Sequence, residues 1–222
     1  MSNPLLVLAS NSARRLQLLA LGGWVFQVHP TDADESQFPA ETPGDYVVRL
    51  AKSKARTCAA TAHADLIILG ADTAVVDGYE ILGKPQDLDE AAAMLRQLRG
   101  HSHQVFTGIA VLRVSDGAII TDLCITNVTI RAYNDNEIES YVLTGDPLDK
   151  AGAYAIQHPG FKPVENLTGC YASVMGLPLC HLSRSLHKLD FAQKTDLSSK
   201  CQSVLNYTCP ISSAVLGGEA IG

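Results

Sequence analysis

The order of apolar and polar positions predicts strands and helices along most of the chain. Unbroken apolar runs at residues 5–9 and 66–69 are typical of buried strands. Apolar residues at helical spacing follow Ser12 and Thr42, which can each cap a helix. The other expected elements are a hairpin turning at Asp77-Gly78, helices capped by Asp87 and Asn134, strands at 104–114 and 118–132, a strand at 170–174 and a helix at 178–189.

The 222 residues are enough for one large domain. From Asp190 onward the chain is rich in Ser, Thr and Lys and loses its apolar periodicity. We therefore expect one domain over residues 1–189, followed by a polar C-terminal extension, residues 190–222, that is poorly ordered.

Net charge and composition limit the binding partners and the cellular compartment that we expect for this protein. The formal net charge of −6 argues against a general nucleic-acid-binding protein, which would need a basic surface. No apolar stretch approaches the roughly 18 residues that would span a bilayer, and the first apolar run is too short for a signal peptide. The six cysteines are scattered, with no C-x-x-C pair, and are expected to be reduced thiols. We therefore expect a cytoplasmic protein without membrane or nucleic-acid partners.

One lysine stands on the apolar face of the helix that Thr42-Pro43 begins. Lys54 falls near the middle of the apolar stripe, whereas Lys52 points away from it. A buried ammonium group is costly without an anionic partner, so Lys54 is expected to meet a carboxylate or a bound phosphate.

Asp72 is the strongest candidate for a functional residue, because it follows an apolar run that predicts a buried strand. One interpretation is that Asp72 only stabilises the hairpin. The other joins it with carboxylates and lysines elsewhere in the chain, namely Asp34, Glu35, Lys54 and Lys84. Carboxylate oxygens suit Mg²⁺ or Mn²⁺, and lysines and arginines suit phosphate oxygens. This set therefore indicates a metal-assisted phosphate site.

Three other patterns have competing interpretations. Arg14 and Arg15 are either ordinary surface residues or part of an anion site at a strand-to-helix turn. His101 and His103 could share one face of a strand, but no third zinc ligand has a suitable spacing. Asp146, Asp149 and Lys150 form either a functional loop or a solvated turn with a local ion pair, and composition does not decide between them.

Eight segments in order resemble the Maf family of nucleotide pyrophosphatases. They are ASNSARR, DADE, RLAKSKA, GADTAVV, LGKP, HQVFTG, GDPLDKAGAYAIQ and MGLPL, and they extend from about residue 5 to residue 188. The resemblance implies an α/β fold with an elongated, mixed central sheet flanked by helices. It also implies two lobes around a cleft, as in inosine triphosphate pyrophosphatases.

The resemblance implies hydrolysis of a nucleoside triphosphate to the monophosphate and pyrophosphate, with Mg²⁺ or Mn²⁺ as cofactor. Asp72 matches the proton acceptor, Glu35 matches an acidic residue that holds metal together with Asp72, and Lys54 and Lys84 match phosphate-handling lysines. The residues that match substrate-binding or specificity positions are Ser10, Ser12, Arg14, Arg15, Thr73 and Gln157.

Within the family, the segment DKAGAYAIQ resembles the branch that acts on dTTP, UTP and modified pyrimidine nucleotides, in a house-cleaning role. Two alternatives stay open. The first is an enzyme for 7-methyl-GTP or a damaged purine nucleotide, and the second is a non-catalytic nucleotide-binding regulator of cell division. The oligomeric state is also open, with a homodimer as one option.

Overall fold

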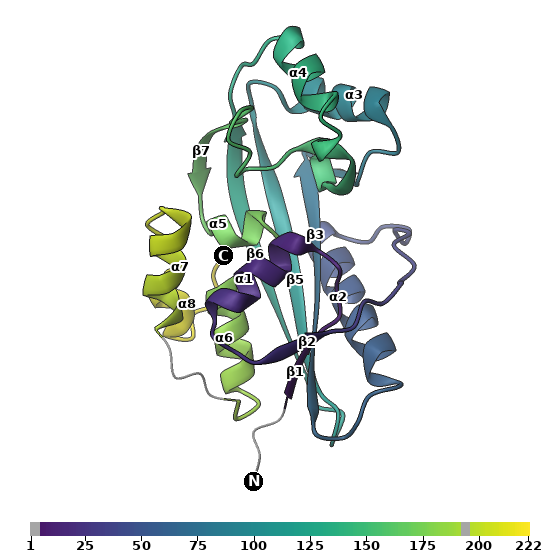
Figure 1. Ribbon diagram of the computed structural model, residues 1–222, viewed down its shortest axis with the longest axis vertical. Coiled ribbons are helices and arrows are strands. Elements are labelled where there is room, and N and C mark those ends of the chain that lie inside the picture. The colour runs from purple at the N-terminus through teal and green to yellow at the C-terminus, as the bar shows by residue number, and fades with distance from the viewer. Residues whose placement is uncertain (1–4, 192–195) are drawn as a thin grey trace.

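A long mixed sheet with helices on both faces forms the body of the protein in the computed structural model, which describes residues 5–191 and 196–222 (Figure 1). The strands are β1 (Leu5–Leu8), β2 (Phe26–Val28), β3 (Leu66–Asp77), β4 (Glu80–Leu82), β5 (Ser102–Arg113), β6 (Ile119–Ile130) and β7 (Val164–Thr168). The α-helices are α1 (Ala13–Leu21), α2 (Pro43–Ala59), α3 (Leu88–Leu98), α4 (Asp135–Val142), α5 (Tyr171–Val174), α6 (Leu179–His187), α7 (Leu197–Leu205) and α8 (Ser212–Leu216). Two 3₁₀-helices, η1 (Asp146–Asp149) and η2 (Ala151–Ala153), lie between α4 and β7.

The strand order is β2-β1-β3-β5-β6-β7, with β4 paired to one end of β3. β1 runs parallel to β2 and β3, and the remaining pairs are antiparallel. β3, β5 and β6 have 12 residues each and pair along nearly their whole length. The expected elongated, mixed sheet is therefore confirmed.

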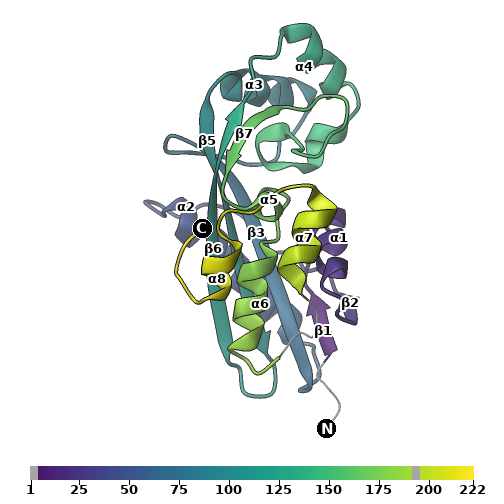
Figure 2. The ribbon, with the colours of Figure 1, turned by 90° about the vertical axis from the view of Figure 1, so that its left-hand side faces the viewer.

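Alternate residues of the central strands enter different cores, as the two-residue period of a strand requires. On β1, Leu6 and Leu8 pack with residues of α1 and α6, while Val7 packs with residues of α2. Figure 2 shows α6 and α2 on opposite sides of the sheet. The continuous apolar run at residues 5–9 thus reflects a strand that is covered on both faces.

Two glycines allow α2 to lie close against the sheet. A Cβ on Gly108 would stand 2.7 Å from the backbone of Val47, and one on Gly70 would collide with the carbonyl of Ala51. No side chain larger than hydrogen fits at either strand position. This close approach brings the buried face of α2, which includes Lys54, against the part of β3 that contains Asp72.

The far ends of the three long strands support a second lobe. There, Val105 and Val128 pack with apolar residues of α3 and α4 in a separate core cluster. Figure 1 shows this lobe above the helices that flank β1 and β3. The molecule thus has the expected two lobes, both built on the same strands.

Two local predictions were wrong. Residues 170–174 were expected to form a strand, but Tyr171–Val174 is one helical turn between Gly169 and Gly176, which both have positive φ; β7 lies earlier, at Val164–Thr168. In the hairpin, Asp77 pairs with Glu80, so the loop consists of Gly78 and Tyr79. Of the two histidines, His101 is exposed and lies beside Asp77, whereas His103 is buried and its Nε2 pairs with the Tyr154 hydroxyl.

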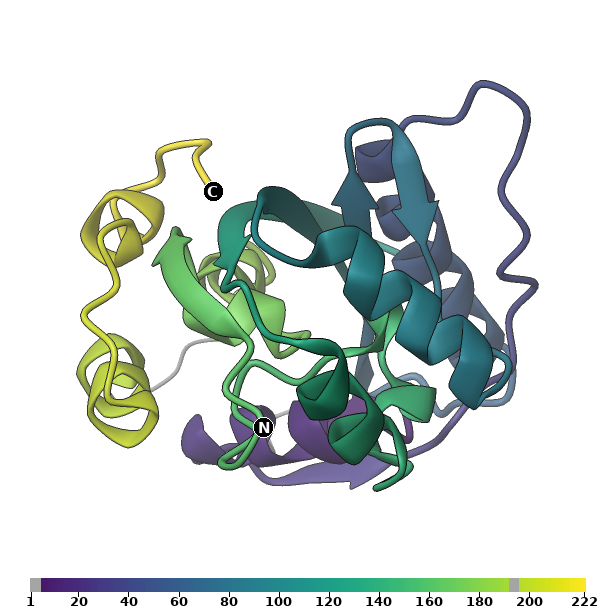
Figure 3. The same cartoon turned by 90° about the horizontal axis from the view of Figure 1, so that it is seen from above.

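The C-terminal extension differs from the expectation of a poorly ordered segment. Asp196 caps α7 by accepting a hydrogen bond from the Ser199 backbone, and Leu197 and Cys201 lie one turn apart in the same core cluster as α6. Arg184 of α6 donates to the carbonyl oxygens of Val215 and Glu219. Figure 3 shows the extension and α2 at opposite sides of the molecule. Within the described residues, no helix has the length and apolarity needed to cross a membrane.

Candidate active site

A cleft of about 400 Å³ lies between the two lobes and collects most of the candidate residues. Its walls come from the β1–α1 turn, the loop after β2, the middle of β3, the segment after β4, the segment after η1 and the turn after α5. The candidates that line it are Ser10, Ser12, Arg14, Arg15, Glu35, Lys54, Asp72, Thr73, Lys84 and Gln157. Residues far apart in sequence therefore converge at one place, as the resemblance implies.

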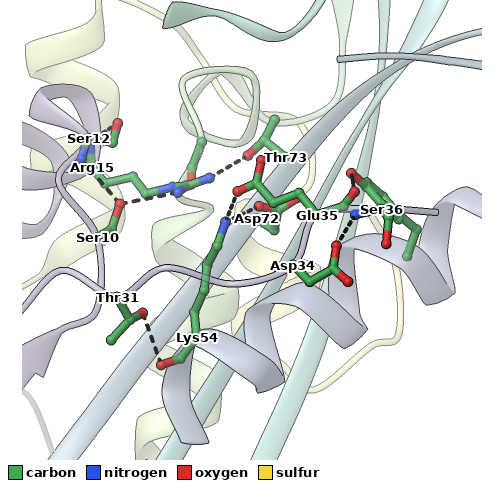
Figure 4. Close-up of polar contacts among 12 residues, drawn as sticks. Ser10, Ser12, Arg15, Thr31, Asp34, Glu35, Ser36, Lys54, Asp72 and Thr73 are labelled. Carbon is green, nitrogen blue, oxygen red and sulfur yellow. Dashed lines mark hydrogen bonds and ion pairs between the residues drawn. The ribbon is translucent and has the colours of Figure 1, made fainter. Parts of the chain in front are cut away.

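Lys54 joins the two main carboxylates at the centre of the cleft. Its Nζ lies 2.8 Å from Glu35 Oε1 and 2.5 Å from Asp72 Oδ1 (Figure 4). Lys54 and Asp72 are buried, whereas about half of the Glu35 side chain is exposed. The expectation that Lys54 turns inward to meet a carboxylate is confirmed.

The electrostatic environment keeps Glu35 ionised. Partial burial favours the neutral acid, but the hydrogen bond and charge of Lys54, aided by Lys84, outweigh it and lower the pKa of Glu35. The loop that carries Glu35 is fixed to α2, because the Tyr46 hydroxyl donates to the Glu35 carbonyl oxygen at 2.8 Å.

The neighbouring carboxylate, Asp34, does not belong to this group. Its Oδ1 accepts a hydrogen bond from the Ser36 backbone at 2.9 Å, and Asp34 is not among the residues that line the cleft. Of the three acidic residues in the DADE segment, Asp32 and Glu35 line the cleft, and Glu35 is the one that shares the Lys54 ammonium group with Asp72.

Arg15 connects three walls of the cleft. Its guanidinium donates to Gly176 O at 2.8 Å, Ser10 Oγ at 3.3 Å and Thr73 Oγ1 at 3.2 Å. Burial lowers the pKa of Arg15, although Asp72 opposes that shift, and an arginine remains charged at neutral pH. Arg15 therefore supplies positive charge near Asp72 from a fixed position.

The β1–α1 turn offers several donors to an anion. Ser12 Oγ accepts from the Arg15 backbone at 3.4 Å, and Ser10 Oγ accepts from the Ser12 backbone at 3.2 Å. Because both hydroxyl oxygens act as acceptors here, their hydrogens can be donated to a ligand. The N-terminal end of α1, with its unpaired backbone N–H groups and positive dipole, also lines the cleft.

The residues expected to select the substrate come from three different parts of the cleft lining, namely α1, β3 and the segment after η2. Arg14 Nη1 lies 3.6 Å from Asp149 Oδ2, and the exposed Gln157 borders the cleft. Thr73 Oγ1 shares a hydrogen bond of 3.0 Å with Thr107 Oγ1. Lys84 follows β4, at the point where Gly83 and Pro85 take the chain out of the sheet.

Several residues of the site were not predicted. The apolar part of the cleft includes Leu82, Val105, Tyr154 and Ile156, which look like ordinary core residues in the sequence. The segment does contain local ion pairs, from Lys150 to Asp146 and Asp149, but Lys150 itself is buried, which a solvated turn does not predict. Only the unusual density of charge around Lys150 hinted at this.

Glu35 and Asp72 are the residues that could hold a divalent metal ion. Both carboxylates already converge on one cation, the Lys54 ammonium group. Among the described residues no cluster of three or more His, Cys, Asp or Glu side chains is arranged to hold a metal ion. Two carboxylates fit Mg²⁺, which commonly takes one or two from the protein and completes its shell with substrate phosphates and water.

Comparisons with known proteins show the family to which the chain is similar. A family model described as Maf-like protein matches residues 5–189. The chain is 45% identical over 190 residues to a dTTP/UTP pyrophosphatase of Anaeromyxobacter dehalogenans (strain 2CP-1 / ATCC BAA-258), covering 85% of this chain and 95% of the relative. It is 47% identical over 175 residues to a dTTP/UTP pyrophosphatase of Escherichia coli O157:H7, covering 78% and 87%. A solved nucleoside-triphosphatase / dITP/XTP pyrophosphatase of Mycobacterium abscessus is 14% identical, with a TM-score of 0.40, covering 83% and 93%.

Proposed function

Because this chain belongs to the Maf family, we propose that it hydrolyses dTTP and UTP to the nucleoside monophosphate and pyrophosphate. Relatives that carry the name dTTP/UTP pyrophosphatase support this choice of substrate, at 45% and 47% identity. One structural observation carries the reaction type: buried Asp72 is paired with Lys54 and Glu35 at the centre of a cleft that also contains Arg15 and Lys84.

In the proposed reaction, Asp72 accepts a proton from the attacking water. Its Oδ1 bonds to Lys54, while its Oδ2 makes no hydrogen bond to any described residue and is open to a water molecule. The water oxygen forms a bond to the α-phosphorus, and the bond from that phosphorus to the bridging oxygen breaks. The electron pair leaves on pyrophosphate, and the proton passes to Asp72.

The cations position the triphosphate and stabilise the charge that develops on pyrophosphate. A triphosphate brings about four negative charges, which Glu35 and Asp72 alone would repel. Lys54, Lys84 and Arg15 offset this repulsion, and the hydroxyl groups of the β1–α1 turn add directional hydrogen bonds.

Glu35 and Asp72 would hold Mg²⁺ or Mn²⁺, which neutralises phosphate charge and orients the phosphate oxygens when bound. Arg14, Thr73 and Gln157, which also line the cleft, select the nucleotide. The free thiols of all six cysteines are consistent with the reducing conditions of the cytoplasm, where we place the reaction.

The test is pyrophosphate release from dTTP, UTP, CTP, 7-methyl-GTP and ITP, each with Mg²⁺ or Mn²⁺. We expect turnover of dTTP and UTP, and a loss of about 100-fold or more in Asp72→Asn, because a general base contributes roughly 10²–10⁴-fold. Nucleotide binding should persist in that variant. Asp34→Asn is the matched control, since Asp34 lies next to Glu35 in sequence but outside the cleft lining.

Each contrary result has a distinct meaning. Comparable turnover in Asp72→Asn would remove Asp72 as the base. Turnover of 7-methyl-GTP or ITP alone would change the substrate class. Binding without turnover of any nucleotide would favour a non-catalytic regulator.

A further inference from the structure

Lys150 makes a set of buried polar contacts at the edge of the cleft. Its Nζ lies 2.9 Å from Asp146 Oδ1 and 2.6 Å from Asp149 Oδ1, and it also donates to the Asp146 carbonyl oxygen. These contacts use all three donors of the ammonium group. Only 7% of the Lys150 side chain is exposed, so these acceptors must replace its hydration.

Asp149 bridges Lys150 to Arg14. One of its carboxylate oxygens bonds to Lys150, and the other lies 3.6 Å from Arg14 Nη1. Because 73% of the Asp149 side chain is exposed, packing does little to fix its rotamer. The bond to buried Lys150 fixes it instead, so Lys150 determines where Arg14 finds its anionic partner.

The same loop supports two more parts of the cleft. Gly152 N donates to Gly83 O at 3.0 Å, directly before Lys84. The Tyr141 hydroxyl donates to Asp146 Oδ2 at 2.7 Å and accepts from Ala155 N at 3.1 Å, two residues before Gln157. Lys150 therefore lies at the centre of a loop that reaches several residues of the proposed site.

We propose that Lys150 is a positioning residue that acts through Asp149 to hold Arg14 in its nucleotide-binding orientation. The inference rests on the proposed role of the cleft as a nucleotide site. An exposed ion pair adds little to the stability of the fold, so the main effect of the Asp149–Arg14 contact is on orientation. Loss of the contact should weaken nucleotide binding and leave the chemical step unchanged.

The test measures four quantities for each variant: KM and kcat for dTTP, the Kd of the non-hydrolysable α,β-imido analogue of dUTP, and Tm. We expect Asp149→Asn, which keeps the shape of the side chain and an oxygen acceptor for Lys150, to raise KM and Kd about fivefold with kcat unchanged, and to lower Tm less than loss of Lys150 does because Asp146 still pairs with Lys150. Lys150→Met should raise KM and Kd similarly and also lower Tm, and Lys150→Arg should restore part of the binding. Asp135→Asn is the control, because Asp135 forms exposed ion pairs with Arg96 and Arg99 outside the cleft lining.

A double-mutant cycle decides whether the effect passes through Arg14. In an Arg14→Ala background, Asp149→Asn should cause no further loss of affinity. Equal losses in the two backgrounds, or no change in Kd in Asp149→Asn, would overturn the inference. If the unaltered chain binds the analogue but releases no pyrophosphate, the proposed reaction fails, while the cycle in Kd still tests the Asp149–Arg14 contact and the Kd of Lys150→Met still tests the role of Lys150.

Discussion

Substitution of Lys54 by methionine tests whether the centre of the site depends on charge compensation. Methionine matches much of the length of the lysine side chain but removes its charge. Asp72, of whose side chain only 10% is exposed, would then be left without the ammonium group that lies 2.5 Å away. Removal of one partner from a buried ion pair costs about 3 kcal/mol or more, because the remaining charge stays poorly hydrated.

This free energy predicts a measurable change in thermal stability. For a chain of this size, about 3 kcal/mol corresponds to a fall in Tm of about 6–12 °C. Urea unfolding followed by circular dichroism gives the free energy directly, provided that the m value stays unchanged. Lys52→Met is the matched control: it is on the same helix, outside the cleft, and should change stability by less than about 0.5 kcal/mol.

Adding Asp72→Asn to Lys54→Met tests whether the unpaired carboxylate causes the loss of stability. If an uncompensated carboxylate destabilises Lys54→Met, then adding Asp72→Asn should recover much of the lost stability, since the buried charge is gone. A change below about 1 kcal/mol in Lys54→Met would refute the reasoning. So would a double variant that is no more stable than Lys54→Met alone.

Two further predictions concern pH and the extension. Burial lowers the pKa of His103 from 6.5 to about 4, so the unfolded chain binds more protons between these values, and stability should fall as the pH falls through this window. His103→Gln should reduce this pH dependence in urea unfolding at pH 5 and 7, and an unchanged slope would assign it to other groups. Leu197→Ala should cost about 2–4 kcal/mol, because Leu197 is 4% exposed in the core cluster beneath α7. The kcat of Leu197→Ala at 25 °C should match that of the unaltered chain. If the Tm of this variant equals that of the unaltered chain, the extension does not pack as described.

The sequence predicted those parts of the site that depend on local periodicity. The helical spacing of Val47, Leu50 and Cys58 was enough to place Lys54 on the buried face of α2. The same reasoning located Asp72, because a short apolar run leads directly to it. Such predictions are reliable because the spacing of apolar residues within a single helix or strand is enough to show which of its faces is buried.

Other features depend on contacts between distant segments. Asp34 and Glu35 are adjacent, and only the position of the loop against Tyr46 decides which one reaches Lys54. Lys150 is buried through contacts with the surrounding structure, whereas the sequence left a functional loop and a solvated turn equally open. The prediction for the extension was wrong for a related reason. The extension has few apolar residues, but Leu197 and Cys201 pack into the main core cluster, and the sequence alone does not show that this surface lies beneath them.

The three long strands have a consequence for how the molecule can move. β3, β5 and β6 extend through both lobes without interruption, so no linker separates the lobes and no hinge can open between them. Hinge motions need a few residues that absorb large backbone rotations, and a paired twelve-residue strand resists such rotations. We therefore expect a ligand to alter the loops around the cleft, chiefly residues 29–42 and the 145–157 loop that Lys150 holds, rather than the angle between the lobes. We expect the radius of gyration in solution to stay the same when a nucleotide binds, while hydrogen exchange slows in those two loops.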